Sequence, residues 1–131
     1  MTGFPLLLVA EDEVLLHAAL EDELTEAGFE VVMVTDGNRA ISHLQDGSKK
    51  FSALVTDIRM GSGPNGWDVA HRARELFPSL PVVYMTGDSA KDWAANGVPN
   101  SVVLSKPFAM AQLVVAVSQL ITDAENNLGS S

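Results

Sequence analysis

The stretch LLLVAEDE, residues 6–13, carries the pattern that decides the fold: a short apolar run that ends in three acidic side chains. Continuous apolar runs, unlike alternating ones, indicate strands that are covered on both faces, as in a parallel sheet flanked by helices. Four further runs of the same kind follow along the chain. The five predicted strands cover residues 6–10, 31–34, 53–56, 81–85 and 102–104.

Segments with helical periodicity separate these runs. In the first segment, Leu16, Leu20 and Leu24 fall on one face at helical spacing, and Gly28 is placed to end the helix. The last segment, residues 110–121, has the same kind of apolar stripe. Shorter helices are predicted over residues 38–45, 67–76 and 89–96.

Five repeats of strand and helix without a shift in composition predict a single doubly wound α/β domain. For this length and alternation we expect the flavodoxin-like (βα)5 class, a five-stranded parallel sheet in the order 2-1-3-4-5 with helices on both faces. We assign residues 1–124 to this domain. The polar residues 125–131 are predicted to form a disordered tail.

Composition excludes several classes of function. The chain has 131 residues, 17 of them acidic and 8 basic, which gives a formal net charge of −9. This surplus repels phosphate backbones and anionic lipid, so no direct binding to nucleic acid or to a membrane surface is expected. The chain has no cysteine, which excludes disulfides, thiolate metal sites and cysteine nucleophiles. Neither a signal peptide nor a run of about 20 apolar residues is present, which predicts a cytoplasmic protein.

Acidic side chains follow two strands that are expected to be neighbours. Glu11 and Asp12 come directly after the first strand, and Asp57 comes after the third. Ligand sites in open α/β sheets lie beyond the carboxyl ends of the strands, where these carboxylates would converge. Close carboxylates repel one another unless some are protonated or a hard cation lies among them. The sequence therefore predicts a site for Mg²⁺, which prefers oxygen ligands.

Thr86 and Lys106 follow the fourth and fifth strands and complete the pattern. An ammonium group and a hydroxyl beside a magnesium site suit a phosphoryl group attached to one of the carboxylates. Taken singly, each residue has an ordinary explanation, such as helix capping for the acidic run and a turn for Asp57. Their joint position at four strand ends favours a metal-assisted phosphoryl site.

These motifs, in this order, resemble one family: the receiver domain of two-component response regulators, here of the stand-alone, single-domain type. The resemblance covers about residues 6–121. It rests on five motifs: Glu11-Asp12, Asp57 with Met60, Gly66, Thr86-Gly87 and Lys106-Pro107-Phe108.

The resemblance implies that Asp57 accepts a phosphoryl group from a phosphohistidine. The donor would be a sensor histidine kinase or a histidine phosphotransferase. Asp12, Asp57 and the backbone carbonyl of Arg59 would hold Mg²⁺, and Glu11 would act at the metal directly or through water.

The resemblance also assigns the remaining residues. Lys106 would pair with the phosphoryl oxygens, and its bond to Pro107 is expected to be cis. Thr86 would carry the change to the face formed by the fourth helix, fifth strand and fifth helix, where an unknown output protein would bind. A homodimer is a further alternative.

Some positions depart from the family pattern. Glu11 stands where aspartate is commoner, and Val103 stands where the switch residue is normally aromatic. The loop at residues 61–65 lacks the usual proline and is about one residue longer. Arg59 and Asp88 lie two residues beyond Asp57 and Thr86, where their side chains can overhang the site. If they pair, we expect them to shield the acyl phosphate from water and slow its loss.

Two alternatives remain open at the level of sequence. One is a receiver-like interaction module that is never phosphorylated. The other is a phosphatase that works through an aspartyl phosphate, which usually needs a second acid two residues beyond the nucleophile, where this chain has Arg59. We expect no turnover of a small molecule. The chain is expected to act by binding another protein, by relaying phosphate or by draining it from a kinase.

Overall fold

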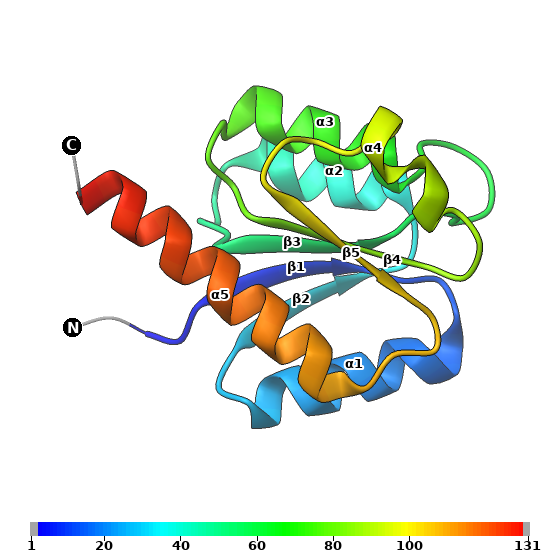
Figure 1. Cartoon of the computed structure of the whole chain (residues 1–131), viewed down its shortest axis with the longest axis horizontal. Helices are drawn as coiled ribbons and strands as arrows, with labels where there is room; N and C mark the ends of the chain where they lie inside the picture. The colour runs from blue at the N-terminus through cyan, green and yellow to red at the C-terminus, as the bar shows by residue number, and fades with distance from the viewer. Residues whose placement is uncertain (1–2, 130–131) are drawn as a thin grey trace.

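Five parallel strands form one sheet in the order β2-β1-β3-β4-β5 (Figure 1). We describe the protein from a computed structural model, in which residues 3–129 are described. The predicted fold class and strand order are confirmed. The strands are β1 (Leu6–Ala10), β2 (Glu30–Val34), β3 (Ala53–Asp57), β4 (Val82–Thr86) and β5 (Ser101–Ser105).

Helices cover both faces of the sheet, with α2 and α3 on one face and α1 and α5 on the other (Figure 1). Alternate strand residues therefore enter two separate cores. Leu8 and Leu54 are fully buried in the first core, and Leu7 and Val55 in the second. The helical elements are α1 (Val14–Glu26), α2 (Gly37–Asp46), α3 (Gly66–Leu76), the 3-10 turn η1 (Ala90–Asp92), α4 (Trp93–Asn96) and α5 (Met110–Gly129).

Local capping fixes where the helices on the first face begin. The Asp36 side chain accepts a hydrogen bond from the Arg39 amide at 2.8 Å and caps α2. At α3, the side chains of Asn65 and Asp68 each accept from the other's backbone amide, which forms a capping box. These caps set the direction of the two helices whose first residues follow the carboxyl ends of β2 and β3.

The fourth and fifth helices differ from their predicted lengths. The helix predicted over residues 89–96 is the turn η1 followed by the four-residue α4, because residues 91–96 are exposed and little packing supports a longer helix. The tail predicted to be disordered over residues 125–131 is instead helical as far as Gly129, since α5 continues through it. Ala124 and Glu125 are good helix formers, and no glycine or proline interrupts the helix before Gly129. Residues 130 and 131 lie outside the described part.

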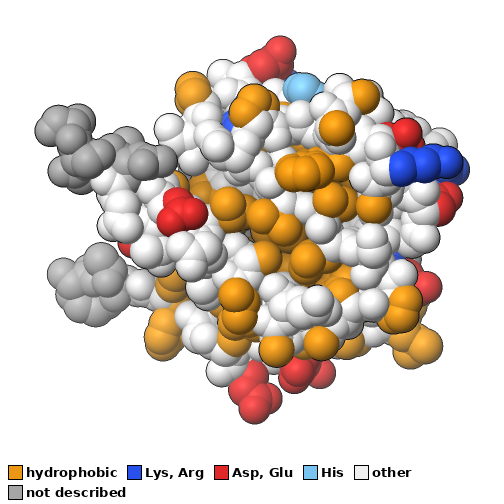
Figure 2. Space-filling model, viewed as in Figure 1, with side chains coloured by type: hydrophobic (Ala, Val, Ile, Leu, Met, Phe, Trp, Pro, Cys, Tyr) orange, Lys and Arg blue, Asp and Glu red, His pale blue; other side chains and the backbone are white. Residues whose placement is uncertain are grey.

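β5 forms one edge of the sheet and is less well covered than the central strands. Its middle residues are half-buried, whereas every residue of β3 and β4 is buried. Figure 2 shows hydrophobic side chains gathered along the middle of the face that carries α4, β5 and α5. Within residues 3–129, no helix is long and apolar enough to cross a membrane.

Candidate functional site

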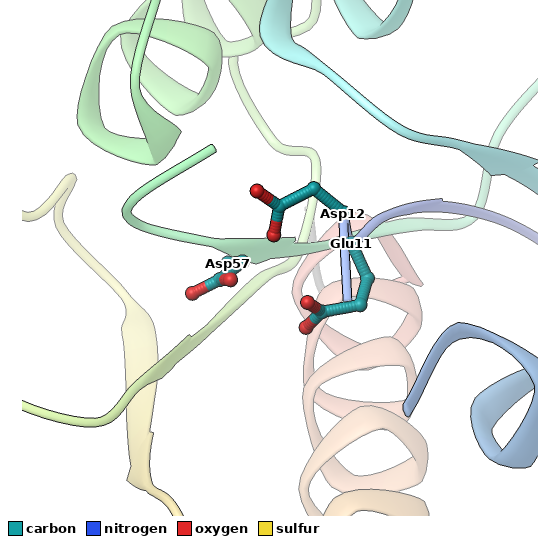
Figure 3. Close-up of side chains that lie close together, drawn as sticks. All are labelled: Glu11, Asp12 and Asp57. Carbon is teal, nitrogen blue, oxygen red and sulfur yellow. The ribbon is translucent and has the colours of Figure 1, made fainter. Parts of the chain in front are cut away.

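Three carboxylates gather at the carboxyl ends of β1 and β3. The two strands are hydrogen-bonded neighbours with Ala10 opposite Thr56, so the residues that follow them lie side by side. Figure 3 shows the side chains of Glu11, Asp12 and Asp57 directed toward a common space. One oxygen from each lies within 4.8 Å of the others. The acidic cluster predicted from the sequence is therefore present.

The three carboxylates differ in burial. Glu11 is fully buried and Asp57 is 7% exposed, whereas Asp12 is exposed. Backbone amides hold the two buried groups in place: Glu11 accepts from the Glu13 amide at 2.9 Å, and Asp57 Oδ1 accepts from the Ile58 amide at 2.8 Å. The cluster thus has a fixed buried side and one carboxylate at the surface.

Lys106 reaches the cluster from the end of β5. Its Nζ lies 3.1 Å from Glu11 Oε1 and 3.2 Å from Asp57 Oδ2, so one ammonium group bridges the two buried carboxylates. Its backbone amide donates to the Thr86 carbonyl at 2.7 Å, and the following bond to Pro107 is cis, as expected. The lysine that the sequence assigned to the phosphoryl oxygens therefore contacts Asp57.

Burial and charge shift the pKa of each group in different ways. Burial raises the pKa of Glu11 and of Asp57, although hydrogen bonds and the charge of Lys106 partly oppose the rise. Burial lowers the pKa of Lys106, but the two carboxylates more than offset it, so that this pKa is raised. One ammonium does not neutralise three carboxylates, and a hard cation with oxygen ligands would. The donor set fits Mg²⁺, and Asp12, Asp57 and Glu11 could hold it.

Thr86 ends β4, the neighbour of β3, and is buried. Its Oγ1 accepts hydrogen bonds from the amides of Ser89, at 2.8 Å, and Asp88, at 3.2 Å. The hydroxyl therefore holds the turn that leads into η1. The contact to Ser89 was not predicted, because no sequence pattern indicates which turn amides a threonine will accept from. Val103, at the position where the switch residue is normally aromatic, is half-buried and packs against the first core.

Arg59 and Asp88 form the ion pair that the sequence raised as a hypothesis. Arg59 Nε lies 3.1 Å from Asp88 Oδ2, and Asp88 also accepts from the Ser89 hydroxyl at 2.8 Å. Both side chains are largely exposed. The pair links the segment after Asp57 to the turn after Thr86, at the rim of the acidic cluster. The role of the Arg59 carbonyl as a metal ligand stays a prediction.

Gly66 has a structural role that the sequence motif did not reveal. Its amide donates to the Ile58 carbonyl at 2.8 Å, and a Cβ at this position would overlap the carbonyl oxygen of Asp57. Glycine therefore lets the first turn of α3 lie directly against the backbone of Asp57.

A family model described as the response regulator receiver domain matches residues 7–118. This match covers most of the chain. The chain belongs to the response regulator receiver family. It is thus a receiver domain of two-component signalling, in which receivers interact with histidine kinases and output proteins.

Relatives of this receiver include proteins of similar length. It is 32% identical over 120 residues to the response regulator receiver protein CpdR of Brucella abortus, covering 90% of this chain and 98% of CpdR. A crystal structure of a response regulator receiver protein from Sinorhizobium medicae is 46% identical, with a TM-score of 0.90, over 92% of this chain and 97% of that one.

A more distant likeness shows the shared fold. The receiver domain of the sensor histidine kinase PA1611 from Pseudomonas aeruginosa, whose structure has a magnesium ion coordinated in the active-site cleft, is 22% identical with a TM-score of 0.78. The alignment covers 92% of this chain and 99% of that domain.

Proposed function

We propose that this receiver takes a phosphoryl group from a phosphohistidine onto Asp57, with Mg²⁺, and thereby changes its binding to an output protein. The donor is a sensor histidine kinase or a histidine phosphotransferase. The observation that carries the proposal is the bridge of Lys106 between Asp57 and Glu11 within a cluster of three carboxylates. A buried carboxylate beside a fixed ammonium group is positioned to accept a dianionic phosphoryl group.

In the transfer, a carboxylate oxygen of Asp57 attacks phosphorus, an O–P bond forms and the N–P bond of the phosphohistidine breaks. The departing imidazole nitrogen keeps the bonding electron pair and takes up a proton. Lys106 contacts Asp57 before transfer and can pair with the phosphoryl oxygens afterwards. When bound, Mg²⁺ supplies positive charge to the phosphoryl oxygens, and Asp12, Asp57 and the carbonyl of Arg59 would hold it with Glu11 nearby.

The switch would begin at Thr86. The new phosphoryl oxygens offer strong acceptors beside β4. We expect the Thr86 hydroxyl to turn toward them and release the amides of Asp88 and Ser89, which loosens the turn before η1 and α4. The change would reach the face of α4, β5 and α5, where an output protein, or a second copy of the chain, would bind.

We propose that the chain turns over no small-molecule substrate. In an aspartyl-phosphate phosphatase, a second acid would stand two residues beyond the nucleophile. Here that residue is Arg59, whose side chain is paired with Asp88. The remaining alternative, an interaction module that is never phosphorylated, differs from our proposal in whether Asp57 can be labelled.

The test is the intact mass of the chain after incubation with a small acyl-phosphate donor, with and without Mg²⁺. We expect one phosphoryl group to be added, only when Mg²⁺ is present, and none to be added to Asp57→Asn. Asp46→Asn, which changes an exposed aspartate at the end of α2, is the matched control and should be labelled normally. If the folded chain neither takes up phosphate nor binds beryllofluoride, the phosphoacceptor role is wrong.

A further inference from the structure

A groove lies at the end of the sheet opposite the acidic cluster. α5 has 20 residues and is much longer than the five-residue strands. Its last turns project past the amino ends of the strands, where the loops between α2 and β3 and between α3 and β4 lie (Figure 1). Between these loops and α5 is an open groove of about 700 Å³. Because the groove lies at the amino ends of the strands, it shares no residue with the candidate phosphorylation site.

The floor and one wall of the groove are apolar. Phe51 and Leu80 line it and are 9% and 6% exposed, and Ile121 contributes from α5. Phe77, directly after α3, lines the same groove and is 39% exposed. A partner's large apolar side chain that packed against the accessible Phe77 ring and the apolar floor would bury apolar surface of both proteins.

Two lysines line the loop side of the groove in a chain whose net charge is −9. Lys49 and Lys50 are exposed, and neither forms an ion pair with any residue between 3 and 129. The nearby Asp46 does not line the groove; its carboxylate accepts from the amide and the hydroxyl of Ser48, and the charge of Lys49 contributes to lowering its pKa. Glu125 is the acidic residue that lines the groove. The charged side chains that line the groove are thus two lysines and one glutamate, which leaves a surplus of positive charge at its rim.

We propose that this groove binds an acidic segment of a partner protein that presents one or two large apolar side chains. The apolar side chains would lie against Phe51, Phe77 and Ile121, and carboxylates of the segment would pair with Lys49 and Lys50. Complementary charge at the rim selects the partner, and the apolar floor supplies most of the affinity. The negative charge of the whole chain opposes an anionic lipid surface as the occupant.

The first test selects random peptides displayed on phage against the full chain. We expect the retained peptides to be rich in Asp and Glu around one or two large apolar residues. By fluorescence anisotropy, a retained peptide should bind about tenfold more weakly to the double variant Lys49→Glu/Lys50→Glu, and more weakly in high salt. Arg39→Glu/Lys91→Glu makes the same charge change at exposed positions that do not line the groove and should bind normally.

A second variant separates the apolar contribution from the charge. Phe77→Ser removes exposed apolar surface and should also weaken the peptide, whereas Asp57→Asn should leave its affinity unchanged. The proposal is overturned if selection yields no acidic, apolar peptides, or if their binding survives both groove variants. It is equally overturned if sedimentation shows that the native chain associates with itself and Lys49→Glu/Lys50→Glu abolishes this, since the occupant would then be a second copy.

Discussion

Lys106 supplies positive charge directly beside the two buried carboxylates of the acidic cluster. Glu11 and Asp57 are both buried, and their pKa values are raised chiefly because burial disfavours the charged carboxylate. A single Nζ within 3.2 Å of both groups supplies the opposing charge. Such a site is stabilised by any further cation that binds among the carboxylates. The residue that stabilises the resting cluster is thus the one that would contact an incoming phosphoryl group.

Arg59 and Asp88 are expected to set how long the phosphoryl group lasts. The pair lies at the rim of the cluster, where it would hinder an attacking water molecule. Arg59→Ala and Asp88→Ala should each speed the loss of phosphate from Asp57. An exposed ion pair contributes up to about 1 kcal/mol, so the rate should rise by no more than about fivefold.

The measurement is the decay of the phosphorylated mass after the donor is removed. Arg72→Ala breaks a comparable exposed ion pair, Arg72 with Glu75, on α3 and should leave the decay unchanged. Equal decay in the native chain and in both site variants would show that the pair does not shield the phosphoryl group.

At the level of single residues, the sequence predicted which groups meet but not how they are held. Asp57 and Lys106 could be placed because the carboxyl ends of parallel strands converge at one edge of the sheet. The contact of Thr86 with Ser89 depends on the path of a turn, which residue types alone do not specify. The close approach of Gly66 to Asp57 depends likewise on how α3 is seated on the sheet.

At the level of elements, the start of α1 offers a contact for the phosphoryl donor. Val14 and Leu15 directly follow the acidic run and are 79% and 84% exposed. Large apolar side chains this exposed beside a reactive site are typical of a protein contact. Leu15→Ser should therefore slow phosphotransfer from a phosphohistidine protein about tenfold, whereas labelling by a small acyl phosphate should not change.

Val115→Ser is the control for this variant, because Val115 is 65% exposed but lies on α5. It should leave both reactions unchanged. Slower labelling of Leu15→Ser by the small donor would mean that the substitution disturbs the site itself. Equal transfer from the protein donor would place the contact elsewhere.

The loop between β3 and α3 is anchored on the start of α2. A Cβ at Gly37 would overlap the carbonyl group of Pro64, so only glycine allows this approach. Gly37→Ala should lower the free energy of unfolding by about 1–3 kcal/mol, as overpacking of a tight contact does. Gly87→Ala is the matched control, since a Cβ there would have no atom within 4 Å. Urea unfolding curves that coincide for native chain and Gly37→Ala would contradict this account.

The lengths of α4 and α5 show where prediction of elements fails. Hydrophobic periodicity located the five strands, whose alternate residues enter the two cores, and the four longer helices, which each bury an apolar stripe. α4 is shorter than predicted since its side chains are exposed, and periodicity cannot compensate for missing packing. α5 is longer since polar residues that read as a tail also continue a helix. Ala124 and Glu125 in that extension line the groove at the amino ends of the strands.

At the level of the whole molecule, Tyr84 connects the first core to the segment between α4 and β5. It is the single tyrosine of the chain and is fully buried at the centre of β4. Its ring centroid lies 4.7 Å from that of Trp67 on α3, and its hydroxyl oxygen accepts from the Val98 amide at 3.1 Å. Burial raises the pKa of Tyr84 above the ordinary value of 10.0, because the tyrosinate anion would lose its solvation in the core.

This shift makes the stability of the fold fall at alkaline pH. Below pH 10 tyrosine is protonated in both the folded and the unfolded chain, so the stabilisation is fully present there. As the pH rises further, the unfolded chain releases the proton first, and the free energy of unfolding falls by up to about 1.4 kcal/mol per pH unit. Tyr84→Phe, measured by urea unfolding across the same range, should lack this contribution, even though the lost acceptor for Val98 destabilises it at every pH. The absorbance of the single tyrosine gives an independent check, and titration at the ordinary pKa in the folded chain would contradict the prediction.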